Sequence, residues 1–136
     1  TDEHGATAAP GVHAVGDCAA WFDARRGRHH RVEHWTESHE RPRTVAARLL
    51  GLEPPRAAAP YFWSEQYDVR LQFAGHREGD ESVTIEAGSA ETQDLLAVYR
   101  CADGSPTAVL GMNQPRLFGR LRRTLATAAT QAPVPA

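Results

Sequence analysis

The chain has 136 residues, of which 41% are hydrophobic and 24% are charged, and its formal net charge at pH 7 is −2. A chain of this length and apolar content can bury the core of an ordinary domain, which excludes disorder as the default state. The net charge gives no overall electrostatic footprint for binding nucleic acid, which would call for a clearly basic domain or stripe. All 15 basic residues are arginines, a bias that we attribute to base composition before function.

Cysteine usage and hydropathy predict a cytoplasmic protein without a membrane partner. Cys18 and Cys101 lie far apart and neither belongs to a C-x-x-C pair, so neither a disulfide framework nor a structural zinc site is expected. No apolar run approaches the ~20 residues that a membrane-spanning helix needs. The N-terminus is acidic and polar, unlike a signal peptide. We therefore expect two free thiols in a reducing compartment.

The first predicted element is a short apolar strand over residues 12–15 that runs directly into Gly16 and Asp17. A strand end of this kind lets an aspartate reach a cofactor in the crevice beyond a sheet. After it, we expect a small helix over residues 18–22. The charged residues 23–28 then favour an exposed turn.

The next predicted element is a helix over residues 36–50. Its apolar residues recur at helical spacing: Val45, Ala46, Leu49 and Leu50. Gly51 ends the helix, and Pro42 predicts either a kink or a late helix start, because a proline inside a helix removes a hydrogen bond. The proline-rich residues 53–60 predict a linker, so we expect one domain to cover residues 1–57 and a second to cover residues 58–136.

The second domain is predicted to contain an antiparallel sheet. Alternating apolar and polar residues from 67 to 73 indicate a half-buried strand that Gly75 ends. Asp103 and Gly104 are typical of a hairpin turn. Further strands are expected over residues 82–85, 95–101 and 107–112.

The last predicted element is a helix from Gln114 to Thr127, whose apolar residues recur at helical spacing and should pack on the sheet. Residues 126–136 are expected to fray. The predicted fold class is therefore α+β. Its first part is the remnant of an α/β domain, with a strand, a loop and a helix. Its second part is a small domain with an antiparallel sheet and a packed helix.

Three blocks of sequence occur in one order: residues 11–17 (Gly-Val-His-Ala-Val-Gly-Asp), 31–35 (Arg-Val-Glu-His-Trp) and 60–68 (Pro-Tyr-Phe-Trp-Ser-Glu-Gln-Tyr-Asp). The chain resembles, over about residues 8 to 115, the C-terminal part of ferredoxin reductases. These NAD(P)H-dependent FAD enzymes feed electrons to [2Fe-2S] ferredoxins of cytochrome P450 and Rieske oxygenase systems. No G-x-G-x-x-G loop follows an apolar strand, so we expect the C-terminal piece of a larger enzyme.

The resemblance implies that residues 1–57 are the C-terminal part of an FAD-binding domain, with NAD(P)H as co-substrate. The implied cofactor-binding residues are Gly16, Asp17, Glu33, His34, Trp35 and Trp63. Asp17 would accept a hydrogen bond from a ribityl hydroxyl of FAD, Trp35 would contribute to the FAD site, and Trp63 would lie beside the isoalloxazine ring. Both tryptophans could instead be domain-interface core. Glu33 and His34 either position nicotinamide or have a structural role.

Charged and metal-ligating residues around the predicted helix allow weaker hypotheses. The family usually has a Gln-Gly or Gln-Ala pair where this chain has Arg41 and Pro42. Arg41, Arg43 and Arg48 either present positive charge to an acidic ferredoxin or form a solvated helix face. The histidines do not make a tetrahedral ligand set with cysteine or carboxylate, so no metal site is expected. Cys18 is interpreted as a packing residue.

Two functions follow as alternatives. The first is a flavoprotein reductase fragment, which passes electrons from NAD(P)H through FAD to a [2Fe-2S] ferredoxin as part of the whole enzyme. Without either dinucleotide phosphate loop, this chain alone would bind FAD weakly or not at all, and no residue in it is assigned as catalytic. The second is a stand-alone protein-interaction module without redox activity.

Overall fold

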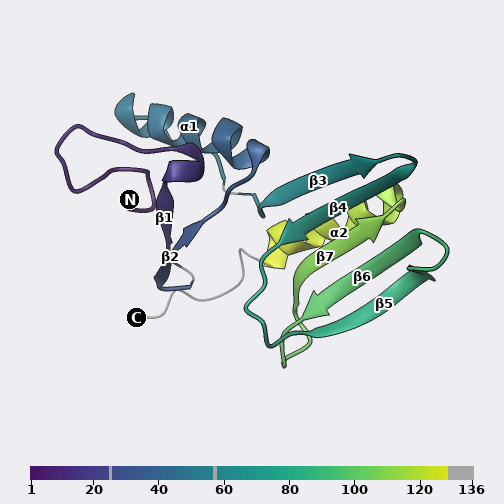
Figure 1. Cartoon of the computed structure of the whole chain (residues 1–136). Coiled ribbons are helices and arrows are strands. Elements are labelled where there is room, and N and C mark those ends of the chain that lie inside the picture. The colour runs from purple at the N-terminus through teal and green to yellow at the C-terminus, as the bar shows by residue number, and fades with distance from the viewer. Residues whose placement is uncertain (25, 57, 129–136) are drawn as a thin grey trace. The chain divides into compact units, whose positions relative to one another are not determined.

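The computed structural model describes residues 1–24, 26–56 and 58–128, which form two compact units that meet in sequence at residues 57 and 58 (Figure 1). We call the N-terminal one unit 1 and the C-terminal one unit 2. Helices and antiparallel sheets both occur, which confirms the α+β class. Within the described ranges, no helix is long and apolar enough to span a bilayer.

Unit 1 contains a small antiparallel hairpin and one long helix. Its elements are the 3₁₀ turn η1 (Gly16–Cys18), strands β1 (Ala20–Asp23) and β2 (Arg28–Arg31), and helix α1 (Trp35–Leu49). The two strands pair so that Trp21 lies opposite His30. Ala19, Trp21 and Val45 form the small core of this unit, which joins the hairpin to α1.

Two sequence expectations for unit 1 are wrong. Residues 12–15 do not form a strand, because only His13 pairs, through an isolated bridge with Ala6. The expected helix over residues 18–22 is replaced by η1 and β1. Short apolar runs such as these are compatible with a helix or a strand, and pairing with a neighbouring strand determines which one forms. The expected turn over residues 23–28 is confirmed for residues 24, 26 and 27, which lie between β1 and β2, and the N–H of Arg26 donates to the carbonyl of Asp23 at 3.1 Å.

Helix α1 begins at Trp35 and contains Pro42, so the expectation of a late helix start is wrong. The end at Gly51 is confirmed, with a left-handed φ of 67°. The N–H of Leu52 donates to the carbonyl of Ala47 at 2.8 Å, and that of Gly51 donates to the carbonyl of Arg48 at 3.2 Å. These bonds satisfy carbonyls that the helix leaves open at its end.

Unit 2 is a five-stranded antiparallel sheet with one helix packed against it (Figure 1). Its elements are β3 (Tyr61–Gln66), β4 (Val69–Gly75), β5 (Ser82–Ser89), β6 (Asp94–Arg100), β7 (Pro106–Met112) and α2 (Pro115–Ala128). The strands lie in the order β3-β4-β7-β6-β5, so β3 and β5 are the edges. The predicted strands at β4 to β7 and the predicted final helix are confirmed. The expected fraying concerns mainly residues 129–136, which lie outside the described residues.

The sequence did not predict β3. The strand was expected to begin at residue 67, yet Tyr67 and Asp68 form the two-residue turn between β3 and β4, with Gln66 paired to Val69. Tyr67 takes a left-handed φ of 54°, which is the conformation that such hairpin turns require.

The predicted hairpin turn at Asp103 and Gly104 is confirmed between β6 and β7. The N–H of Gly104 donates to the carbonyl of Cys101 at 2.9 Å, and the N–H of Cys101 donates to the carbonyl of Ser105 at 3.0 Å. The hydroxyl and N–H of Ser105 both donate to the Asp103 carboxylate, which holds the pKa of that carboxyl below its usual range.

The core of unit 2 lies between the sheet and α2. Its buried residues are Ala74, Leu96, Val98, Val109, Phe118 and Leu125. Phe118 is 2% exposed and packs over Gly111 of β7, where an added Cβ would lie 3.2 Å from the Phe118 Cβ. The absence of a side chain at Gly111 therefore lets α2 approach the middle strand.

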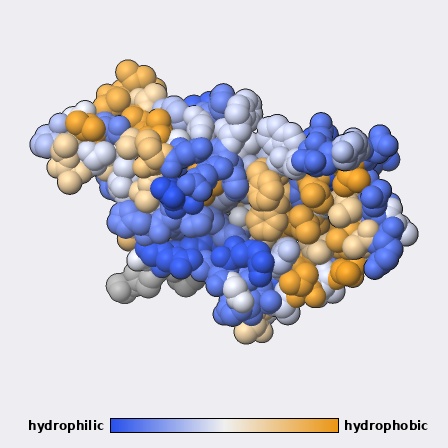
Figure 2. All heavy atoms as spheres, viewed as in Figure 1, coloured by the Kyte–Doolittle hydropathy of each residue, from blue (hydrophilic) through white to orange (hydrophobic). Residues whose placement is uncertain are grey.

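The opposite face of the sheet is also apolar. Phe62, Phe73 and Tyr99 form a row across it, with ring centroids 5.4 Å and 6.0 Å apart in successive pairs. Val83 and Ile85 of β5 are 52% and 58% exposed. Figure 2 shows apolar side chains gathered on this face of unit 2. Sheets with one solvated face usually carry polar residues there, so this face is unusual for a surface.

The sheet geometry predicts different effects for two glycines with similar backbone angles. Gly75 has φ 105° and an added Cβ would lie 2.2 Å from the Thr107 carbonyl oxygen, whereas Gly79 has φ 103° and open space around it. We expect Gly75→Ala to lower the free energy of unfolding by about 3 kcal/mol or more, and Gly79→Ala by about 1 kcal/mol. Urea unfolding followed by circular dichroism measures both. Equal losses would show that backbone strain alone, and not the close strand contact, constrains Gly75.

Candidate functional site

In unit 1, the predicted Gly16 and Asp17 lie in η1, against the first turns of α1. Gly16 has a left-handed φ of 76°, and an added Cβ would lie 3.5 Å from the Ser38 hydroxyl oxygen. The Ser38 hydroxyl donates to Asp17 Oδ1 at 3.5 Å, a long hydrogen bond. The Asp17 side chain is otherwise exposed. Its carboxylate therefore retains the capacity to accept a hydrogen bond from a hydroxyl group.

The second group of predicted residues surrounds the start of α1. Trp35 is 64% exposed and its ring packs on His39, with centroids 3.9 Å apart and planes at 34°. His34 is the N-cap residue, although its side chain makes no capping bond. Glu33 is exposed and forms an ion pair of 2.9 Å with Arg31. Trp35 thus offers a large accessible ring, whereas Glu33 already has a cationic partner.

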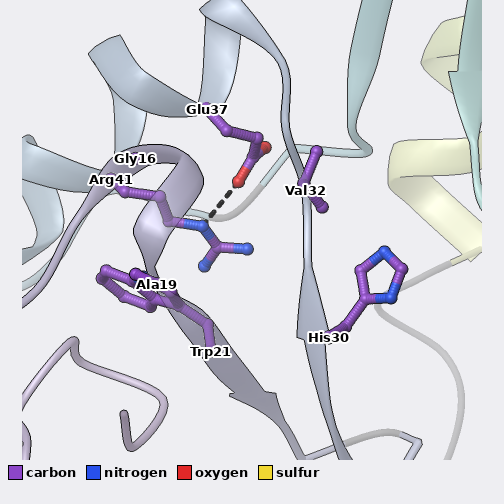
Figure 3. Close-up of a pocket in the computed structure, with 7 residues that line it drawn as sticks. All are labelled: Gly16, Ala19, Trp21, His30, Val32, Glu37 and Arg41. Atoms are coloured by element: carbon purple, nitrogen blue, oxygen red, sulfur yellow. Dashed lines mark hydrogen bonds and ion pairs between the residues drawn. The ribbon is translucent and has the colours of Figure 1, made fainter.

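Behind these residues lies a buried ion pair that the sequence reasoning missed. Glu37 is only 5% exposed and accepts a hydrogen bond of 2.6 Å from Arg41 Nε. The Arg41 guanidinium also lies over the ring of Trp21, with Cζ 4.6 Å from the ring centroid (Figure 3). The spacing of four residues between a glutamate and an arginine is the signal that could have identified the pair. This cluster of Glu37, Arg41 and Trp21 joins α1 to the β1–β2 hairpin.

A small cavity lies beside this cluster, lined by the residues labelled in Figure 3. It admits about one water molecule, so it is far too small for a cofactor ring. The buried Trp21 Nε1–H has no protein acceptor among the described residues. A cofactor ring therefore does not fit in this cavity.

The three arginines proposed for a partner differ in their surroundings. Arg43 and Arg48 are exposed on α1, whereas the Arg41 side chain is only 27% exposed and is paired with Glu37. A docking role on this helix therefore depends on Arg43 and Arg48.

In unit 2, the predicted Trp63 lies on the edge strand β3. It is 40% exposed and stacks on Tyr61, with ring centroids 5.7 Å apart and planes at 20°. Tyr61 in turn contacts residues of β4 and α2 that the sequence reasoning did not identify. Trp63 therefore presents an accessible aromatic ring that is packed on one side.

The structure brings Gly16 and Asp17 together at the start of α1, where Trp35 is also located. Trp63 belongs to unit 2. Among the described residues, no three histidine, cysteine or acidic side chains come close enough to hold a metal ion. Unit 1 thus offers the Asp17 carboxylate and the exposed ring of Trp35, and unit 2 offers the ring of Trp63.

Comparison with known proteins gives a consistent result. The family described as reductase C-terminal matches residues 61–135. The chain is 32% identical over 127 residues to the ferredoxin–NAD(+) reductase component of the anthranilate 1,2-dioxygenase system of Burkholderia cepacia, covering 93% of this chain and 31% of that protein. It is 34% identical over 124 residues to putidaredoxin reductase of Pseudomonas putida, covering 91% and 29%.

The solved structures include a similar fold in the covalent complex of putidaredoxin reductase with putidaredoxin. The TM-score is 0.85 at 33% sequence identity, and the match covers 93% of this chain and 30% of that chain. The present chain thus spans about a third of the length of these relatives.

The buried ion pair of α1 gives a prediction for unit 1. Replacing Glu37 with alanine leaves the Arg41 guanidinium without its carboxylate, so we expect the free energy of unfolding to fall by about 2 to 4 kcal/mol. Glu40→Ala removes an exposed carboxylate from the same helix and is expected to change it by less than about 0.5 kcal/mol. Urea unfolding followed by tryptophan fluorescence measures both variants, in a background where Trp35 and Trp63 are replaced by phenylalanine so that Trp21 alone reports. Equal effects would mean that the pair adds nothing to unit 1.

Proposed function

The chain belongs to the reductase C-terminal family, and we propose that it is part of an FAD-dependent reductase that passes electrons from NAD(P)H to a [2Fe-2S] ferredoxin. The observation that carries this proposal is Trp63, a large aromatic ring on an edge strand that is packed on one side and accessible on the other. The names of the relatives support the reductase assignment. Free Cys18 and Cys101 are consistent with a cytoplasmic enzyme.

The residues present suit one part of an FAD site. Asp17 would accept a hydrogen bond from a ribityl hydroxyl, and Trp63 would form a wall beside the isoalloxazine ring, where it excludes water. Trp35 and Gly16 would complete the surface near Asp17. Glu33 and His34 immediately precede Trp35 in the sequence. When bound, FAD supplies hydride acceptance and one-electron transfer.

The phosphate-binding part of such a site is a glycine-rich loop at a helix N-terminus, and no G-x-G-x-x-G motif follows an apolar strand in this sequence. We infer that residues 1–57 complete an FAD-binding domain and that residues 58–136 form the reductase C-terminal domain. The remaining two thirds of the relatives' length would supply the pyrophosphate cradle and the nicotinamide site.

A second candidate function is a protein-interaction module without redox activity. The apolar face of the sheet opposite α2 favours this alternative, since exposed apolar faces mark interaction surfaces. The two functions differ in what they require of Trp63. Partner binding by a module would survive Trp63→Ala, whereas in a reductase this change would alter the flavin spectrum and slow hydride transfer.

Titration with FAD tests the main proposal. We expect this chain alone to bind FAD with a Kd above about 0.1 mM, because it lacks the phosphate loop that would supply much of the affinity. A longer polypeptide that includes the upstream region of a reductase should bind stoichiometrically, as measured by flavin fluorescence and the quenching of tryptophan. An FAD-loaded preparation of this chain alone would contradict the division of the site, and a longer polypeptide without flavin would contradict the function.

The arginines of α1 allow a second test in a reductase that contains this chain. We expect the double change Arg43→Glu and Arg48→Glu to lower the rate constant for ferredoxin reduction about tenfold at low ionic strength, because complementary charge accelerates encounter. The difference should vanish near about 0.5 M salt. The control, Arg116→Glu with Arg120→Glu, makes the same change in net charge on the exposed side of α2. Equal effects of the two double changes would exclude a local docking role for α1.

A further inference from the structure

Tyr61 and Trp63 are two residues apart on β3, so their side chains lie on the same face of the sheet. Strand β3 is an edge of the five-stranded sheet and pairs there with β4. A large side chain on an edge strand has several rotamers open to it unless other side chains restrain it. Trp63 stacks nearly parallel on Tyr61, with planes at 20°. Contacts that hold Tyr61 therefore bear on the orientation of Trp63.

Three side chains hold Tyr61 from different directions. The Phe118 ring centroid lies 5.8 Å away, and the Arg122 guanidinium carbon lies 4.1 Å from the Tyr61 ring centroid. Gln72 Nε2 donates to the Tyr61 hydroxyl oxygen at 2.9 Å. Phe118 and Arg122 are four residues apart on α2, so one face of the helix supplies both contacts.

Gln72 is unusual because it is a polar residue that is only 9% exposed. It lies directly opposite Trp63 in the β3–β4 register, and its amide reaches diagonally to Tyr61. A buried amide requires a hydrogen-bond partner, and Tyr61 supplies one. The bond therefore fixes the position of the Tyr61 ring beside the paired residues Trp63 and Gln72.

The contacts around Tyr61 favour a fixed arrangement. Immobilising a large side chain costs conformational entropy. The stacked aromatic pair and the cation over the Tyr61 ring both act against that cost. Both rings are therefore restrained before any ligand arrives, which is the condition for a preorganised site.

We propose that Arg122 and Gln72 are positioning residues that act through Tyr61 to hold Trp63 as a rigid wall for the flavin. The importance of this wall rests on the proposed function, whereas the immobilisation of Trp63 is a property of unit 2 alone. Arg122 and Gln72 touch Tyr61 and are not assigned contact with the cofactor.

The test uses this chain with Trp35→Phe as the background. Of the two remaining tryptophans, Trp21 is 4% exposed and Trp63 is 40% exposed, so a soluble quencher such as acrylamide reports on Trp63. We expect Arg122→Gln to raise the quenching constant about twofold and to weaken the near-ultraviolet circular dichroism of the stacked rings. Arg122→Lys keeps a cation over the ring and should restore most of both signals.

Two further variants keep the proposal falsifiable. Arg120→Gln removes an exposed arginine from the same helix and should change neither signal. Tyr61→Phe retains the ring but leaves the Gln72 amide without its acceptor, so it should raise quenching even where Arg122 is intact. Unchanged quenching and circular dichroism in both Arg122→Gln and Tyr61→Phe would overturn the proposal. These measurements need no FAD, so failure of a longer polypeptide to bind flavin would contradict the proposed function while leaving this result unaffected.

Discussion

Unit 2 depends on how closely α2 approaches the sheet, and Gly111 on the middle strand β7 permits that approach. Any side chain there would press against Phe118, whose Cβ and Cδ2 would both lie 3.2 Å from an added Cβ. With Phe118 seated over the glycine, Arg122 reaches the ring of Tyr61 from one turn further along the helix. Because Gly111 has no side chain, α2 lies close enough to the sheet for Phe118 and Arg122 to contact Tyr61 at its edge.

Much of unit 2 was predictable from the sequence because burial on one face imposes a regular pattern. The alternation along β4 and the helical spacing along α2 both reflect packing against the same core. Strand β3 escaped prediction for a physical reason. Its consecutive residues Phe62 and Trp63 are 37% and 40% exposed on opposite faces of an edge strand, so the strand shows no alternation of apolar and polar residues.

Unit 1 was harder to predict, because its strands are four residues long and its core is small. Short apolar runs do not distinguish strand from helix without their partners. The arginines of α1 show that site residues are equally hard to predict without knowledge of their partners. Arg41, Arg43 and Arg48 look alike on a helical pattern, yet only Arg41 turns toward a buried carboxylate. Contacts between elements, such as the one between Gln72 and Tyr61, likewise have no local sequence signature.

The two units support their exposed residues in different ways: a 3₁₀ turn against α1 holds Asp17, and a stack built on Tyr61 holds Trp63. The most direct measurement is a crystal structure of a flavin-loaded reductase that contains this chain. We expect the Asp17 carboxylate within about 3 Å of a ribityl hydroxyl and the Trp63 ring in contact with the isoalloxazine. A flavin bound away from both side chains would contradict the proposed FAD site.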